Sequence, residues 1–181
     1  PGSAQKGCEN STSCHVAMAD SWIEPQNFEK LAAIKAKHPG MKIMYSIGGW
    51  NNSNGYAECA DTPAKRAALA SSIKDFLDKH SFFDGVDLDW EFPVAGGENN
   101  QKHSPQDTQN FADLITAIRG AIGKNYYLTV ATPPAENGGS AHITDMPLAT
   151  LASDQVDWIN FMAYDYHGTW ETTSNFLAPL Y

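Results

Sequence analysis

Helix-like and strand-like segments alternate along the chain, and this alternation restricts the fold more than any other feature of the sequence. Apolar residues at helical spacing predict helices over 25–38, from Thr62 onward, over 104–122 and near 147–153. Short apolar runs predict strands over 41–47, 82–92, 126–132 and 156–164. Strands separated by helices pair in parallel, as in a doubly wound sheet or a (β/α) barrel. Because a complete eight-stranded barrel takes about 250 residues, four strands predict a small open sheet or part of a barrel.

Composition and charge exclude several classes of protein. Hydrophobic residues make up 42% and charged residues 18% of the 181 residues, which indicates a globular chain. The formal net charge of −9 disfavours binding to nucleic acid or to an anionic membrane surface. No apolar run approaches the roughly 18 residues of a membrane span. A neutral or cationic substrate fits this balance of charge better.

Three cysteines, Cys8, Cys14 and Cys59, allow more than one arrangement. Cys8 and Cys14 bracket a short polar loop and are candidates for a disulfide in an oxidising compartment, which would leave Cys59 over. The alternative is three unpaired thiols. Neither their spacing nor the scattered histidines suits a metal site, and we expect no metal and no cofactor.

A row of carboxylates is the strongest functional signal. Side chains alternate between the two faces of a strand, so that one face of the segment 84–91 is acidic and the other apolar. The acidic face carries Asp87, Asp89 and Glu91, and the apolar face carries Val86, Leu88 and Trp90. Crowded carboxylates retain a proton near neutral pH, which supplies a general acid beside ionised partners, as glycoside hydrolysis requires. A divalent-metal site and a solvated edge strand are the alternatives.

Three segments resemble glycoside hydrolase family 18, the chitinase family. FDGVDLDWEFP at 83–93 is similar to the D-G-x-D-x-D-x-E signature of that family. SIGGW at 46–50 is similar to its strand-three motif and MAYDYHGTW at 162–170 to its strand-six motif. The bacterial secreted chitinases are the most similar group, so the resemblance implies a secreted protein.

The resemblance implies an α/β fold, the (β/α)8 TIM barrel, present here only in part. In this interpretation the chain 1–181 is a partial catalytic domain. Residues 1–24 form the loop after strand two, and residues 25–181 supply strands three to six and the following loop. The first strand, the seventh and the last have no counterpart in this sequence.

The resemblance also implies a mechanism in which the 2-acetamido group of the substrate is the nucleophile, one of the exceptions to the scheme with two catalytic carboxylates. Glu91 matches the acid that protonates the leaving oxygen and later activates water. Asp89 matches the residue that orients the acetamido group and stabilises the positive charge on it. Asp87 matches an inner partner that shares a proton with Asp89.

Further residues are expected at the site from the same resemblance or from their places after strand ends. Tyr164 and Asp165 match residues that contact the acetamido group, Met162 lines its pocket, and Ser46 matches a hydroxyl near the inner aspartate. Core packing would also explain Met162 and Tyr164, and a turn cap would explain Asp165.

Two tryptophans after strand ends, Trp50 and Trp170, are candidates for stacking on sugar rings, or else for anchoring loops. Asp84 has the opposite parity to the acidic row and is expected to be structural.

The leading hypothesis is therefore a chitinase acting on chitin and chito-oligosaccharides, with no nucleic-acid or membrane partner. A chitinase-like lectin that binds the sugar without cutting it is one alternative, although such relatives usually lack the acid that Glu91 supplies here. An endo-N-acetylglucosaminidase of the same family acting on N-glycan cores is another.

Overall fold

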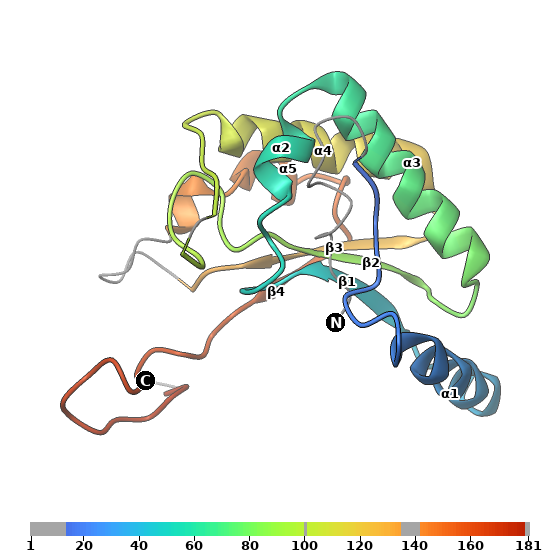
Figure 1. The fold of residues 1–181 in the computed structure, drawn as a ribbon, viewed down its shortest axis with the longest axis horizontal. Coiled ribbons are helices and arrows are strands. Elements are labelled where there is room, and N and C mark those ends of the chain that lie inside the picture. Colours follow the sequence, from blue (N-terminus) through green and yellow to red (C-terminus); the bar gives the residue numbers. More distant parts are fainter. Residues whose placement is uncertain (1–13, 100, 135–141, 180–181) are drawn as a thin grey trace.

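The four strands lie side by side in one sheet, and their order in the sheet is their order along the chain. The computed structural model describes residues 14–99, 101–134 and 142–179. Its strands are β1 (Met44–Gly48), β2 (Gly85–Asp89), β3 (Tyr127–Thr132) and β4 (Trp158–Phe161). All three neighbouring pairs are parallel. A doubly wound sheet reverses its order at a switch point, so the uninterrupted order favours part of a barrel (Figure 1).

The helices occupy the predicted connections between the strands, with two short additions. The helical elements are α1 (Glu24–Lys37), α2 (Tyr56–Ala60), α3 (Pro63–Lys79), α4 (Asp107–Ile122), η1 (Ile143–Asp145) and α5 (Leu148–Leu151). The sequence did not predict α2 and η1, because a single turn carries too little periodicity to be recognised. Ahead of α1, the described residues of the predicted N-terminal loop form an isolated bridge at Ala17 and a turn over 21–23.

Two strand predictions were too long at their C-terminal ends. Strand β2 ends at Asp89 and β4 ends at Phe161, although the predictions extended to 92 and 164. Apolar character continues past both ends, but the backbone leaves the sheet there. The consequence is functional, because Glu91 and Tyr164 lie on the segments that follow the strands.

The hydrophobic core lies between the sheet and the helices α3 and α4, which cover one face (Figure 1). On β2 and the residue after it, the even-numbered side chains are at most 1% exposed: Val86, Leu88 and Trp90. The helices contribute apolar side chains that are equally buried, including Leu69, Ile73, Leu114, Ile115 and Ile118. The predicted parity of the strand is thereby confirmed, because burial of the apolar face forces the carboxylates to the other face.

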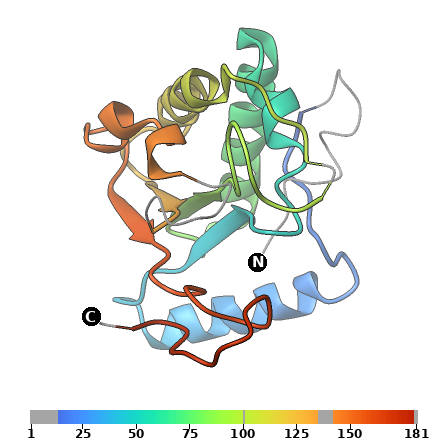
Figure 2. The same ribbon diagram turned by 90° about the vertical axis from the view of Figure 1, so that its left-hand side faces the viewer.

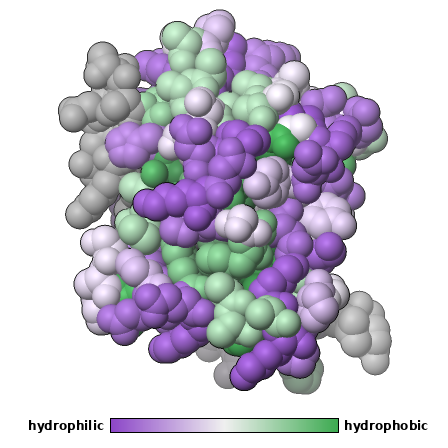
Figure 3. All heavy atoms as spheres, turned by 90° about the vertical axis from the view of Figure 1, so that its right-hand side faces the viewer, coloured by the Kyte–Doolittle hydropathy of each residue, from purple (hydrophilic) through white to green (hydrophobic). Residues whose placement is uncertain are grey.

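Helix α1 flanks the β1 edge and attaches through an aromatic cluster (Figure 2). The Phe28 ring makes edge contacts with Tyr45 at 6.0 Å and Phe83 at 5.3 Å between centroids. A groove of about 490 Å³ lies beside this cluster. It is bordered by residues of α1, by the segment after α3 that includes Phe82, and by Met18 ahead of α1. It contains no residue of the carboxylate row. Figure 3 shows that hydrophilic side chains cover most of the right-hand face, with hydrophobic side chains gathered between them.

Two aspartates that precede strands tie neighbouring strands together. Asp84 Oδ2 accepts a hydrogen bond from the backbone N–H of Ile43 at 2.7 Å and pairs with Lys35 at 2.6 Å. Asp157 Oδ2 accepts from the N–H of Leu128 at 2.8 Å and pairs with the buried guanidinium of Arg119 at 2.6 Å. Both clamps lie at the amino ends of the strands, so Asp84 has the structural position expected for it.

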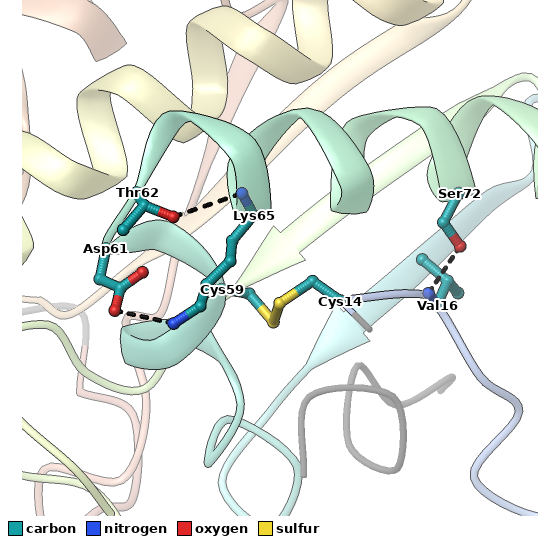
Figure 4. Close-up of a disulfide and its surroundings, with 7 residues drawn as sticks. All are labelled: Cys14, Val16, Cys59, Asp61, Thr62, Lys65 and Ser72. Atoms are coloured by element: carbon teal, nitrogen blue, oxygen red, sulfur yellow. Dashed lines mark hydrogen bonds and ion pairs between the residues drawn. A yellow bond between two sulfur atoms is a disulfide. The ribbon is translucent and has the colours of Figure 1, made fainter. Parts of the chain in front are cut away.

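The disulfide joins Cys14 to Cys59, across 45 residues of sequence (Figure 4). The predicted pairing of Cys14 with Cys8 is therefore wrong, and Cys8 itself lies outside the described residues. The bridge fastens the N-terminal segment to α2, and the Val16 N–H donates to Ser72 Oγ on α3 at 2.9 Å. Sequence spacing favoured the short loop, whereas the fold brings α2 against the segment before α1.

Candidate active site

The three carboxylates gather at the carboxyl end of β2, on the face of the sheet opposite to α3 and α4. Asp87 and Asp89 lie on the strand, and Glu91 lies two residues beyond the end of it. All three are partly buried. Carboxyl ends of parallel strands are where ligands bind in α/β folds, so we take this row as the candidate site.

Asp87 accepts hydrogen bonds from all three of the other strands. Ser46 Oγ on β1 lies 3.0 Å from Asp87 Oδ2, and Thr129 Oγ1 on β3 lies 2.5 Å from Asp87 Oδ1. The Asn160 amide on β4 donates to the same Oδ1 at 2.8 Å. The parallel register aligns Ser46, Asp87 and Thr129 in one row. The structure therefore brings the predicted Ser46 to Asp87, together with two residues that the sequence did not single out.

Asp89 and Glu91 form a hydrogen-bonded pair. Burial, the charge of Asp89, the hydrogen bond to Asp89 and the charge of Asp165 together raise the pKa of Glu91 to about 8, with burial the largest cause. Burial and the charge of Asp87 raise the pKa of Asp89 to about 6, against the lowering effect of the bond from Glu91. The arrangement favours one proton on Glu91 at neutral pH, donated to an ionised Asp89. Asp87 thus acts on Asp89 through its charge, whereas the shared hydrogen bond lies between Asp89 and Glu91.

One oxygen of Asp89 has no hydrogen-bond partner among the residues that the structure describes. Asp89 Oδ1 is buried and receives no hydrogen bond from the described residues. A buried carboxylate oxygen without a donor is costly. It is therefore a candidate to accept an N–H from a ligand.

Two glycines let the end of β1 approach the catalytic strand closely. Gly48 has φ +107°, and a Cβ there would stand 2.1 Å from the Asp89 carbonyl oxygen. Gly49 has φ +86°, and its N–H donates to the same carbonyl at 2.7 Å. Both the left-handed backbone and the close approach require glycine. This contact accounts for the GG pair of the SIGGW segment.

Ser53 ties the loop after β1 to the backbone on both sides of the carboxylate pair. Its buried Oγ accepts from the Glu91 N–H at 2.9 Å. The same hydroxyl lies 2.9 Å from the Gly49 carbonyl oxygen and 3.0 Å from that of Asp89. No sequence pattern singles out Ser53, since a single serine in a polar loop is common.

Replacing Ser53 with alanine should lower the free energy of unfolding by about 1–3 kcal/mol, because the Glu91 N–H and the Asp89 carbonyl lose a buried partner. Chemical denaturation at neutral pH measures this. Ser71→Ala, an exposed position on α3, is the matched control and should change the value by at most about 0.5 kcal/mol. Equal stability of the two variants would contradict the role of Ser53.

Tyr164 and Asp165 follow β4 and lie close to the carboxylate pair. Burial raises the pKa of the Tyr164 phenol, and the charges of Glu91, Asp89 and Asp165 raise it further. Asp165 has φ +55°, a left-handed conformation that is uncommon for a residue other than glycine. The turn at Asp165 places its charge near enough to act on Glu91. Both residues are thus brought to the site as expected.

The remaining predicted residues have less contact with the row. Met162 is half-buried just after β4, and its N–H donates to the Thr132 carbonyl at 3.0 Å. Trp50 is 52% exposed in the turn after β1, and Trp170 is 65% exposed with its ring against Gly168. Both rings are thus exposed on loops that follow strands.

The part of the chain that the structure describes contains no group of three or more His, Cys, Asp and Glu side chains placed to hold a metal ion. Within the same residues, no helix is long and apolar enough to span a membrane.

Comparison with known proteins places these features in context. The family model described as "Glycosyl hydrolases family 18" matches residues 8–181. Chitinase A1 of Niallia circulans is 42% identical over 171 residues, which are 89% of this chain and 24% of that protein. Chitinase C of Streptomyces lividans is 37% identical over 159 residues, covering 84% and 24% respectively. The chain thus spans about a quarter of the length of these relatives.

Solved structures are similar over nearly the whole chain. Chitinase ChiA74 from Bacillus thuringiensis superposes with a TM-score of 0.81 at 31% identity, over 93% of this chain and 32% of that one. Catalytic domain 2 of the Group II chitinase of Ostrinia furnacalis, an E2180L mutant in complex with a chito-oligosaccharide, gives 0.79 at 30% identity, over 93% and 43%.

Proposed function

Because the chain belongs to the glycosyl hydrolases of family 18, and its own fold is part of the (β/α)8 barrel expected from the sequence, we propose that it forms part of the catalytic domain of a chitinase. The reaction is hydrolysis of β-1,4 linkages between N-acetylglucosamine units. The observation that carries the proposal is the pair of Glu91 and Asp89. It combines a carboxyl that keeps its proton at neutral pH with an adjacent carboxylate that has a free buried oxygen.

The pair suits a substrate-assisted mechanism. Glu91 donates its proton to the glycosidic oxygen as the bond from that oxygen to the anomeric carbon breaks. The 2-acetamido oxygen of the same sugar bonds to the anomeric carbon, and Asp89 accepts the acetamido N–H and stabilises the positive charge. Glu91, now ionised, then takes a proton from water. The water oxygen attacks the anomeric carbon and displaces the acetamido oxygen from it.

The surrounding residues supply binding and orientation. Tyr164 and Asp165 contact the acetamido group, and Met162 contributes an apolar wall to its pocket. Trp50 and Trp170 offer exposed aromatic faces on which sugar rings can stack. Ser46 holds Asp87, whose charge raises the proton affinity of Asp89. Uncharged sugars need no basic binding surface, so they are compatible with a chain whose net charge is −9.

Secretion follows from the same proposal. The Cys14–Cys59 bridge is typical of proteins that fold in oxidising compartments, and polymeric chitin is too large to enter a cell.

The direct test uses the full-length protein with chito-oligosaccharides and cello-oligosaccharides of equal length. We expect shorter chito-oligosaccharides as products and no cleavage of the cello-oligosaccharides, which lack the acetamido nucleophile. Comparable cleavage of both would exclude the substrate-assisted mechanism, and binding without cleavage would indicate the lectin alternative.

The pH dependence of kcat/KM should be bell-shaped, with its two limbs near the raised pKa values of Asp89 and Glu91. Activity should fall as the pH rises through about 8, where Glu91 loses the proton that it donates. It should also fall as the pH drops through about 6, where Asp89 takes up a proton. The limbs belong to the coupled pair rather than to either residue alone. A profile that stays flat from pH 5 to 9 would contradict this assignment.

A further inference from the structure

Asn160 is the residue of β4 that contacts the carboxylate row. Its amide nitrogen lies 2.8 Å from Asp87 Oδ1 and 3.5 Å from Thr129 Oγ1. Serine and threonine hydroxyls either donate or accept, so Ser46 and Thr129 do not by themselves select one protonation state of Asp87. An amide N–H only donates, and it therefore favours the carboxylate anion over the protonated acid.

The amide of Asn160 has two possible orientations, and Trp158 selects one of them. The indole Nε1–H of Trp158 is a donor only, and it lies 3.1 Å from Asn160 Oδ1. The amide oxygen therefore points to Trp158, which leaves the NH₂ group to face Asp87. The Trp158 ring packs against Tyr127 on β3, with centroids 5.3 Å apart. The chain of contacts runs from Trp158 through Asn160 to Asp87.

We propose that Asn160 is a positioning residue for the carboxylate row, oriented by the Trp158 indole so that its amide N–H donates to Asp87 and fixes the direction of that carboxylate. The catalytic consequence rests on the proposed function, because the charge of Asp87 acts on Asp89, the partner of Glu91. The ionisable groups near Asp87 are Asp89 on its own strand and the buried phenol of Tyr56 on α2. Strands β1 and β3 present only the hydroxyls of Ser46 and Thr129 to it.

The first test is the pH profile of kcat/KM for chito-oligosaccharide hydrolysis in the full-length protein. Asn160→Leu removes the donor, and the coupled aspartates should then take up a proton at higher pH. We expect the acidic limb to move up by less than the roughly one to two pH units that a hydrogen bond to a charged group is worth, since the lost bond is made to Asp87 and the limb belongs to the coupled carboxylates. Asn160→Asp keeps the shape but adds a carboxylate, and should move the limb at least as far. Trp158→Phe frees the amide to turn and should give a smaller shift in the same direction.

A purely structural role predicts a different result, namely fewer active molecules with the limb at the wild-type pH. Asn110→Asp is the control for the added charge, since it makes the same change on α4, across the core from the row. It should leave the limb in place.

The second test does not depend on turnover. The loss of melting temperature caused by Asn160→Leu should be larger at pH 7 than at pH 3, because the lost bond stabilises an ionised carboxylate that acid neutralises. An unmoved limb in both Asn160 variants, or an equal loss of melting temperature at the two pH values, would overturn the proposal. If the wild type cleaved no chito-oligosaccharide, the proposed function would fail, while the melting comparison would still decide the role of Asn160.

Discussion

Glu91→Gln in the full-length protein should lower kcat for chito-oligosaccharide hydrolysis by about 10²–10⁴-fold, the usual contribution of general acid–base catalysis. The amide preserves the size and most contacts of the side chain but has no proton to transfer at neutral pH. Substrate affinity should change little, because the sugar is held by the aromatic and acetamido contacts. Single-turnover kinetics combined with binding of the oligosaccharide to the variant separates these effects.

The control for this variant is Glu29→Gln, which makes the same change on the exposed side of α1 and should retain wild-type activity. Retention of more than about a tenth of the wild-type turnover by Glu91→Gln would disprove the assignment of Glu91 as the acid. Wild-type protein that binds oligosaccharides but does not cut them would favour the lectin alternative instead.

Asp89→Asn should lower kcat by about 10²–10³-fold, in the range found when one group that stabilises transition-state charge is removed. The amide still forms hydrogen bonds, but it carries no negative charge to stabilise the cationic intermediate. A second effect tests whether Asp89 sets the proton affinity of Glu91. The charge of Asp89 and its hydrogen bond help to raise the pKa of Glu91, so the basic limb of the pH profile should move to lower pH in this variant.

The matched change is Asp75→Asn, at an exposed position on α3, and it should alter neither kcat nor the basic limb. A basic limb at the wild-type pH in Asp89→Asn would show that Asp89 does not set the proton affinity of Glu91. Unchanged kcat would remove Asp89 from the mechanism.

Much of the fold was determined locally and could be predicted from sequence. Apolar spacing located four helices and four strands, and Thr62 caps α3 as expected, with its Oγ1 accepting from the Lys65 N–H. The period-two pattern of the acidic segment set the parity of Asp87, Asp89 and Glu91, because only one face of that segment is apolar and packs against the helices. The family itself followed from the same short motifs.

Contacts between distant segments were decided only by the tertiary structure. The disulfide partner of Cys14 is Cys59, since packing of α2 outweighed the proximity of Cys8 in the sequence. Thr129, 42 residues away, is the register partner of Asp87, and Asn160, 73 residues away, reaches Asp87 from the strand on the far side of β3. No local pattern records such a register. The division of protons between Asp89 and Glu91 likewise depends on burial and on neighbouring charges, which exist only once the strands are assembled.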